Sequence, residues 1–136
     1  MPDTIRQVDY FYMLVPDKAG EAARVLRTLK DAGVNLLAFS GFPEGRRGQL
    51  DFFPADAAAF KSAAKAAKWK VIGPKRGLLI QGDDRVGAIA DLVGRLADAK
   101  IDVTAIDAVS IDGRYGALCF VAPRDVKKAA QVLGAQ

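Results

Sequence analysis

The 136-residue sequence contains no histidine and only one cysteine, Cys119. Histidine is the commonest general base and metal-binding side chain, so its absence removes the usual centre of acid–base and metal chemistry. Cys119 lies in the apolar run from Ala117 to Val121, which is typical of a buried strand residue rather than of a nucleophile. We therefore expect a protein that is not an enzyme and that needs no metal or other cofactor.

Disulfide pairs and long apolar segments are missing as well. A single cysteine cannot form an intrachain disulfide, and residues 1–7 include no hydrophobic signal core. No apolar run approaches the length of a membrane span. These observations predict a cytoplasmic protein without a membrane partner.

Positive charge is not concentrated in any one segment. The formal net charge is +4, but basic residues such as Arg24, Arg27 and Lys30 recur at helical spacing and alternate with acids. A nucleic-acid-binding surface would gather its positive charge in one patch. We expect solvated helix faces here, and no nucleic-acid partner.

The sequence repeats itself. Residues 16–20 align with residues 83–87, and at the same offset residues 34–38 align with residues 101–105, with apolar positions that coincide almost throughout. Internal similarity of this kind indicates two copies of one supersecondary unit. We expect the first module in residues 1–73 and the second in residues 74–136, joined by a short, stiff connector at 73–76.

Each copy predicts the same order of elements. Runs rich in β-branched, aromatic and aliphatic residues predict strands, and apolar residues at helical spacing predict helices. The expected strands are 8–15, 34–42, 49–53 and 69–72 in the first copy, and 77–81, 101–111 and 117–121 in the second. Asp56 and Asp125 are well placed to cap the second helix of each copy. The predicted fold class is α+β and ferredoxin-like βαββαβ, as two tandem modules of which the second lacks its last strand.

The opening strand is apolar on both of its faces. Residues 8, 10, 12 and 14 point one way and residues 11, 13 and 15 the other, and nearly all are apolar. Because the helices of a βαββαβ module cover only one face of its sheet, the other face should be polar if it met water. We expect that face to pack against the other half or a second subunit, and hence a homodimer or a tightly self-packed pair of modules.

The segment between the first strand and first helix of each copy carries a motif. It reads Asp17-Lys18-Ala19-Gly20 in the first copy and Asp84-Arg85-Val86-Gly87 in the second, and the next strand opens with residues 32–36 or 99–103. This pattern resembles the signature of the ACT domain, in which a polar residue, a basic residue and a glycine open the helix. The resemblance covers nearly the whole chain and looks closest to stand-alone tandem ACT proteins.

The resemblance implies a regulatory protein that binds a free amino acid at the interfaces of paired ACT modules. Glycine lets a backbone approach a ligand closely, and free N–H groups at a helix N-terminus attract a carboxylate. The ligand-binding positions that the resemblance implies are Asp17, Lys18, Ala19, Gly20, Asn35 and Leu36 in the first copy, and Asp84, Arg85, Val86, Gly87, Asp102 and Val103 in the second.

These positions also have structural interpretations. Asp17 and Asp84 could be helix N-caps, the two glycines could serve helix–sheet packing alone, and Asn35 could satisfy local backbone groups. If both copies bind, we expect the first to hold a neutral amino acid better, because Asn35 adds no charge whereas Asp102 would repel a carboxylate.

Three other functions fit the same topology. An RNA-recognition module would need stacked aromatics, but the glycine and aromatic positions of residues 113–120 are out of register with that motif. An acylphosphatase-like enzyme would need an anion-binding loop, where residues 15–21 offer acids instead. A scaffold or protein-interaction module without ligand stays open.

Overall fold

The computed structural model describes residues 3–135. These residues form six strands, four α-helices and one short 3₁₀-helix. The strands are β1 (Thr4–Pro16), β2 (Leu36–Glu44), β3 (Arg47–Pro54), β4 (Ile72–Asp83), β5 (Val103–Ile111) and β6 (Arg114–Val121). The helices are α1 (Glu21–Asp31), α2 (Ala57–Ala66), α3 (Ala88–Asp98), η1 (Pro123–Asp125) and α4 (Val126–Leu133).

The strands form a sheet in the order β2-β3-β1-β4-β6-β5. β3 pairs antiparallel with both β1 and β2, and β6 pairs antiparallel with both β4 and β5. The β5–β6 hairpin turns on Asp112 and Gly113, whose φ angles are 53° and 76°. Two consecutive positive φ angles are what a two-residue hairpin turn of type I′ requires.

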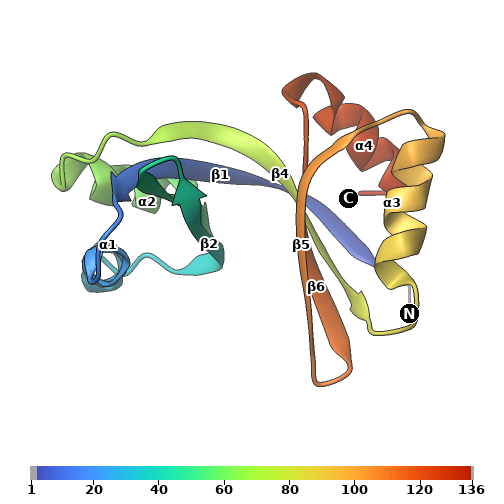
Figure 1. Cartoon of the computed structure of the whole chain (residues 1–136), viewed down its shortest axis with the longest axis horizontal. Helices are drawn as coiled ribbons and strands as arrows, with labels where there is room; N and C mark the ends of the chain where they lie inside the picture. Colours follow the sequence, from blue (N-terminus) through green and yellow to red (C-terminus); the bar gives the residue numbers. More distant parts are fainter. Residues whose placement is uncertain (1–2, 136) are drawn as a thin grey trace. The chain divides into compact units, whose positions relative to one another are not determined.

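The chain forms two compact units that do not follow one another along the sequence. One unit comprises Asp9–Lys75, and the other comprises the chain from Arg76 onward together with the N-terminal residues up to Val8. The first part of β1 and the last part of β4 therefore belong to the unit that contains β5 and β6 (Figure 1).

The core of the Asp9–Lys75 unit is aromatic. The Phe60 ring of α2 stacks on Phe11 of β1 with 4.7 Å between ring centroids, and lies 5.2 Å from Phe52 of β3. Asp56 caps α2 as expected, because its Oδ1 accepts hydrogen bonds from the N–H groups of Ala58 and Ala59 at 3.0 and 3.2 Å. Asp125, the other expected cap, precedes α4 but makes no side-chain capping hydrogen bond among the described residues.

The core of the other unit is aliphatic. In Figure 1, α3 and α4 lie on the same side of the β5–β6 hairpin, and their buried residues meet the inward side chains of β4 and β6. Cys119 is 1% exposed in this core, which confirms its prediction as a buried strand residue. Ile5, from the other end of the chain, is buried in the same cluster at 3% exposure.

Two expectations about the strands are corrected. Residues 69–71 lie outside any strand, because α2 ends in a turn in which Lys68 has φ 61° and the Trp69 N–H donates to the Ala64 carbonyl at 3.0 Å. The Trp69 ring still packs on Phe52, which explains its strand-like pattern. The expected connector, residues 73–76, lies inside β4, a single strand that runs from Ile72 to Asp83.

The second module was expected to lack its last strand. No strand follows α4 among the described residues, but the N-terminal stretch of β1 is grouped with this unit and places Ile5 in its core. The second copy therefore lacks a last strand in chain order, but the start of β1 contributes to its packed core. A sequence pattern read from one end to the other misses this, since the added segment lies at the start of the stretch expected to form the first module.

We predict that Ile5→Ala lowers the free energy of unfolding of the unit containing β5 and β6 by about 2–5 kcal/mol, because it opens a cavity in a closed core. Arg6→Ala, at the exposed neighbouring position, is the matched control and should change stability by less than about 0.5 kcal/mol. Amide hydrogen exchange resolves the two units. Equal protection of Leu92 and Leu96 in both variants would contradict the assignment of Ile5 to this core.

Candidate functional site

The loops that precede α1 and α3 have the same unusual geometry. The N-cap residues are Gly20 and Gly87, with φ angles of 90° and 81°, and among the described residues no side chain caps either helix. Asp17 and Asp84 are therefore not N-caps. A Cβ added at either glycine would meet no described atom within 4 Å, so the glycines are required by their positive φ and not by helix–sheet packing.

The uncapped glycines leave the first turns of the helices open. The first N–H groups of an α-helix have no acceptor within the helix, and an N-cap side chain normally satisfies one of them. In α3 the Ala88 N–H donates to the Arg85 carbonyl at 3.3 Å, whereas Ile89 and Ala90 face a pocket. The first turn thus exposes backbone N–H groups and the positive end of the helix dipole to solvent.

A pocket of about 270 Å³ lies against the second loop. Three elements contribute to it: the loop with the first turn of α3, the end of β5, and the start of β6. Its lining residues are Asp84, Arg85, Gly87, Ala88, Ile89, Ala90, Ala108, Val109, Ser110 and Tyr115. The structure therefore brings together three of the expected residues, Asp84, Arg85 and Gly87. Val86 is not among them, because its side chain projects fully exposed from the loop.

Arg85 is held by a carboxylate from the start of the chain. Its Nη2 lies 3.2 Å from Asp3 Oδ2 and its Nη1 lies 3.3 Å from Asp3 Oδ1, so both ends of the guanidinium meet the carboxylate. A weaker ion pair, at 3.8 Å, joins Arg85 to Asp91 in the first turn of α3. Asp84, in contrast, has an exposed side chain, and its backbone N–H donates to the Gly113 carbonyl at 2.9 Å.

Tyr115 forms the buried wall of this pocket. The side chain is 5% exposed, and its hydroxyl makes no hydrogen bond within the described part of the chain. Burial, and after it the nearby Asp3 carboxylate, raises the pKa of Tyr115 to about 12, against an opposing effect of Arg85. The hydroxyl is therefore protonated at neutral pH and can donate a hydrogen bond.

The first loop differs in its charges. Glu21, the first residue of α1, lies where the second copy has Ala88. Its carboxylate bonds Arg24 at 2.7 Å and lies 3.8 Å from Lys18, and the bond to Arg24 is the main cause that holds the pKa of Glu21 below its ordinary value. The start of α1 thus already has an acid of its own, which would repel a ligand carboxylate there.

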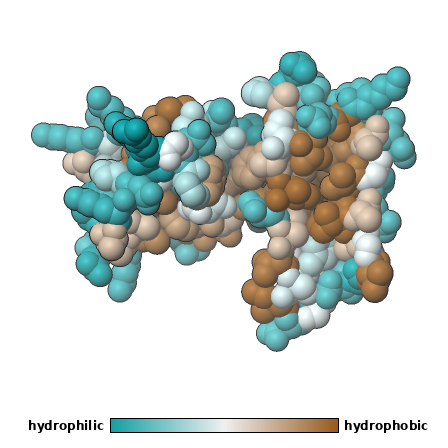
Figure 2. Space-filling view, in the orientation of Figure 1, coloured by the Kyte–Doolittle hydropathy of each residue, from teal (hydrophilic) through white to brown (hydrophobic). Residues whose placement is uncertain are grey.

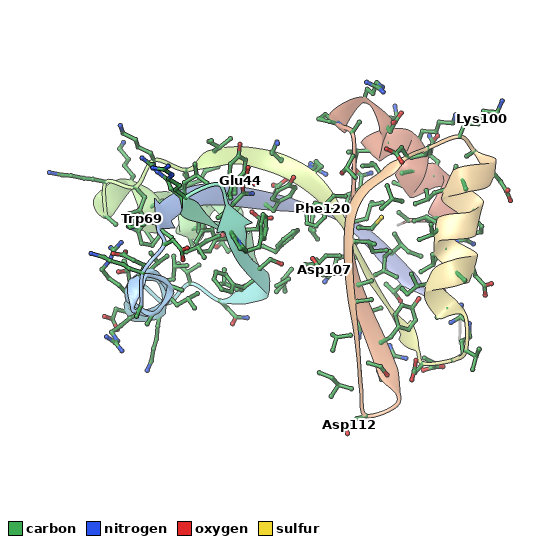
Figure 3. The ribbon with its side chains drawn as sticks, in the orientation of Figure 1. Glu44, Trp69, Lys100, Asp107, Asp112 and Phe120 are labelled. Carbon is green, nitrogen blue, oxygen red and sulfur yellow. The ribbon has the colours of Figure 1, made fainter. Side chains whose placement is uncertain are left out.

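The remaining expected residues lie at the other end of each helix. Asn35 and Leu36 follow α1 and line a separate pocket of about 470 Å³, whereas Asp17–Gly20 precede α1. Asp102 and Val103 likewise follow α3; Figure 3 labels their neighbour Lys100 at the far end of α3 from the second loop. Each of these 11-residue helices is roughly 16 Å long. Within one unit, the loop and the strand residues therefore cannot touch one small ligand.

Sequence reasoning missed three residues near the second loop: Asp3, Ser110 and Tyr115. Alternation along β6 could have placed Tyr115 on the helix-facing side, since residues 115, 117, 119 and 121 are all buried. Ser110 then follows, because it pairs with Tyr115 across the hairpin. No sequence pattern indicated Asp3 as a site residue, since its position depends on the start of β1 belonging to the unit that contains β5 and β6.

Exposed apolar residues gather on the same hairpin. Val109 is 59% exposed and Ile111 65% exposed at the end of β5, where Figure 2 shows apolar surface on the unit that contains β5 and β6. In the described part of the chain, no helix has both the length and the apolar character that crossing a membrane demands.

The chain is similar to several solved structures in its fold. A protein of Bacteroides thetaiotaomicron, BT0572, matches with a TM-score of 0.81 at 17% identity, over 97% of this chain and 88% of that one. The ligand-free regulatory subunit of aspartate kinase from Thermus thermophilus matches with a TM-score of 0.69 at 16% identity, over 98% and 95% of the two chains. Aspartokinase α and β subunits match with a TM-score of 0.68 at 17% identity, again over 98% and 95%.

No family model matches the sequence, and no curated protein matches it. The similarity to solved structures, at such low identities, shows a shared fold. It agrees with the α+β, ACT-like architecture expected from the sequence.

We predict that Asp3→Asn lowers the melting temperature at neutral pH and that the difference from the parent protein shrinks in acid. Burial alone would raise the pKa of the Asp3 carboxyl, but its contacts with Arg85 and Tyr115 outweigh burial and lower the pKa below the ordinary value of 3.8. A carboxylate with a lowered pKa stabilises the fold above its unfolded pKa, and this contribution is lost as the pH falls through the folded value. Thermal unfolding of both proteins from pH 7 to pH 2 measures the difference. A difference that stays constant below pH 4 would contradict the ion pair.

Proposed function

We propose that this chain is a non-catalytic regulatory protein of the ACT type that binds a free amino acid at the interfaces of paired modules. The observation that carries the proposal is the repeated strand–helix loop, in which a left-handed glycine leaves the helix N-terminus uncapped and open. The shared fold with regulatory subunits of aspartate kinase supports the regulatory class.

An α-amino acid is the ligand that suits the second loop best. Its carboxylate matches the free N–H groups of Ile89 and Ala90, and its ammonium group matches the exposed Asp84 carboxylate. The side chain would lie against Ile89, Ala108 and Val109. The volume of about 270 Å³ lies near the lower limit for ligand pockets, which favours a small molecule.

We propose the second loop, rather than the first, as the better site for the carboxylate. Glu21 brings a negative charge to the first residue of α1, whereas the equivalent residue of α3 is the uncharged Ala88. The first-turn acid of α3, Asp91, comes three residues later and pairs with Arg85 at 3.8 Å. Asn35, the basis for preferring the first copy, is exposed and lies beyond the other end of α1. The Asn35 amide would contact the ligand only if another module placed its strand–helix loop beside it.

A second copy of the chain is the simplest source of such a module. The loop and strand residues lie at opposite ends of each helix, so a ligand that touches both sets needs two modules. Val109 and Ile111 offer exposed apolar surface next to the pocket. We therefore propose that the protein works as a homodimer.

A scaffold module without ligand is the second candidate. The exposed apolar side chains of β5 favour it, because they would serve a protein interface equally well. Acylphosphatase chemistry has less support, since Asp17 and Glu21 place carboxylates at the loop that would have to hold a phosphate.

We predict that at least one of the twenty common amino acids raises the melting temperature, because a ligand that binds only the folded state stabilises it. At 100 times its dissociation constant, the rise should be about 5 °C or more for a chain of this size. Asp84→Asn should weaken that ligand about 10-fold or more, since it removes a charged partner of the ammonium group. Differential scanning fluorimetry and titration calorimetry measure both effects.

Two variants control this experiment. Asp98→Asn changes an exposed carboxylate at the far end of α3 and should leave binding unchanged. Asp17→Asn changes the first loop and reports whether that copy also binds. If no amino acid alters stability at millimolar concentration, amino-acid binding is wrong and the scaffold function takes its place.

A further inference from the structure

The Asp3 carboxylate occupies a position that is shaped for a carboxylate. Arg85 meets both of its oxygens, at 3.2 and 3.3 Å, in the two-pronged arrangement that guanidinium groups form with carboxylates. Only 13% of the Asp3 side chain is exposed. The Asp3 carboxylate is therefore largely covered, while the Arg85 side chain that holds it is 41% exposed.

Gly82 of β4 makes room for this carboxylate. A Cβ at Gly82 would overlap an oxygen of Asp3 and would lie 2.9 Å from Cε1 of Tyr115. The Asp3 carboxylate thus rests on bare backbone between Arg85 and the ring of Tyr115. Gly82 does not have a left-handed φ angle. Glycine is required at this position only because Asp3 and Tyr115 approach its backbone so closely.

Tyr115 adds a second, independent feature. Its hydroxyl is buried, protonated at neutral pH and without a hydrogen bond in the described part of the chain, although the Asp3 charge lies near enough to act on it. A buried donor without a well-placed acceptor is unfavourable, so an acceptor placed better than the Asp3 carboxylate would stabilise this hydroxyl. A free carboxylate, which is not tied to a strand, can turn to meet both Arg85 and the hydroxyl.

We propose that the space between Arg85 and Tyr115 is a carboxylate-binding position, and that Asp3 is a tethered competitor for it. A ligand carboxylate in the adjoining pocket would displace Asp3 from Arg85 and accept a hydrogen bond from the hydroxyl of Tyr115. The natural ligand named by this proposal, an α-amino acid, rests on the proposed function. The position itself and the competition do not.

The competition connects the pocket to the N-terminal strand. Asp3 directly precedes β1, and Ile5 two residues later is buried in the core of the same unit. Displacing Asp3 removes one of the contacts that hold this segment, so an occupied pocket loosens the start of β1. Ligand binding in the pocket would then change the start of β1, a strand that continues into the Asp9–Lys75 unit.

Acetate tests the position without any assumption about amino acids. Asp3→Ala removes the tethered carboxylate, and we expect acetate to raise the melting temperature of this variant above the same concentration of chloride by about 3–6 °C. The parent protein should show a smaller rise, because Asp3 competes. Asp3→Ala combined with Arg85→Gln should show none. The matched control is Asp98→Ala, which lacks an exposed carboxylate elsewhere on α3 and should respond as the parent does.

Asp3→Asn provides a second variant in case Asp3→Ala does not fold. It keeps the shape of the side chain but not the charge, and should bind acetate about 10-fold more tightly than the parent, seen as NMR shifts at Arg85 and Tyr115. Equal acetate responses in the parent, Asp3→Ala and the Arg85→Gln combination would overturn the proposal. A positive acetate result with no amino-acid response would keep the carboxylate position and reject the amino-acid function.

Discussion

The left-handed backbone at Gly20 and Gly87 determines what the starts of α1 and α3 can do. A helix that begins on such a residue has no side chain to cap it, and its first N–H groups stay available. The space in front of both glycines is open, so the amides can be reached from outside. Everything proposed for the function depends on this geometry, since a conventional aspartate cap would fill the same hydrogen bonds internally.

The two copies then diverge through single residues at the helix start. Glu21 pairs with Arg24 and Lys18, so the first copy supplies its own negative charge. Ala88 supplies none, and the basic residue of the second loop, Arg85, holds a carboxylate from a distant part of the chain instead. The same backbone thus carries different charges at its first helical residue in the two units, and we propose that the start of α3 is the one that binds an anion.

Much of the fold could be predicted from the sequence. The repeat, the positions of four helices and the Asp56 cap follow from local patterns, because apolar periodicity and capping act over a few residues. The helix ends also repeat. Gly33 and Lys100 have φ angles of 73° and 61°, and the N–H of the residue after each donates to a carbonyl of the preceding helix. Lysine adopts the left-handed conformation at Lys100 although the sequence contains no glycine there to indicate it.

The parts that could not be predicted depend on distant contacts. The start of β1 joins a unit whose other residues begin at Arg76, and no local pattern reports such a partner. For the same reason Asp3 is not among the site residues that the sequence predicts, and neither is Tyr115. Val86 was expected at the ligand, but a left-handed Gly87 turns the loop so that this side chain points to solvent.

The central proposal is that an amino-acid carboxylate binds at the start of α3, beside Arg85 and Tyr115. The most direct measurement is an NMR titration of the isotope-labelled protein with whichever amino acid stabilises it most. The account predicts that shifts concentrate at Ile89 and Ala90, at the loop before them and at Tyr115. Shifts confined to Asn35 and the end of α1, with α3 unaffected, would contradict it.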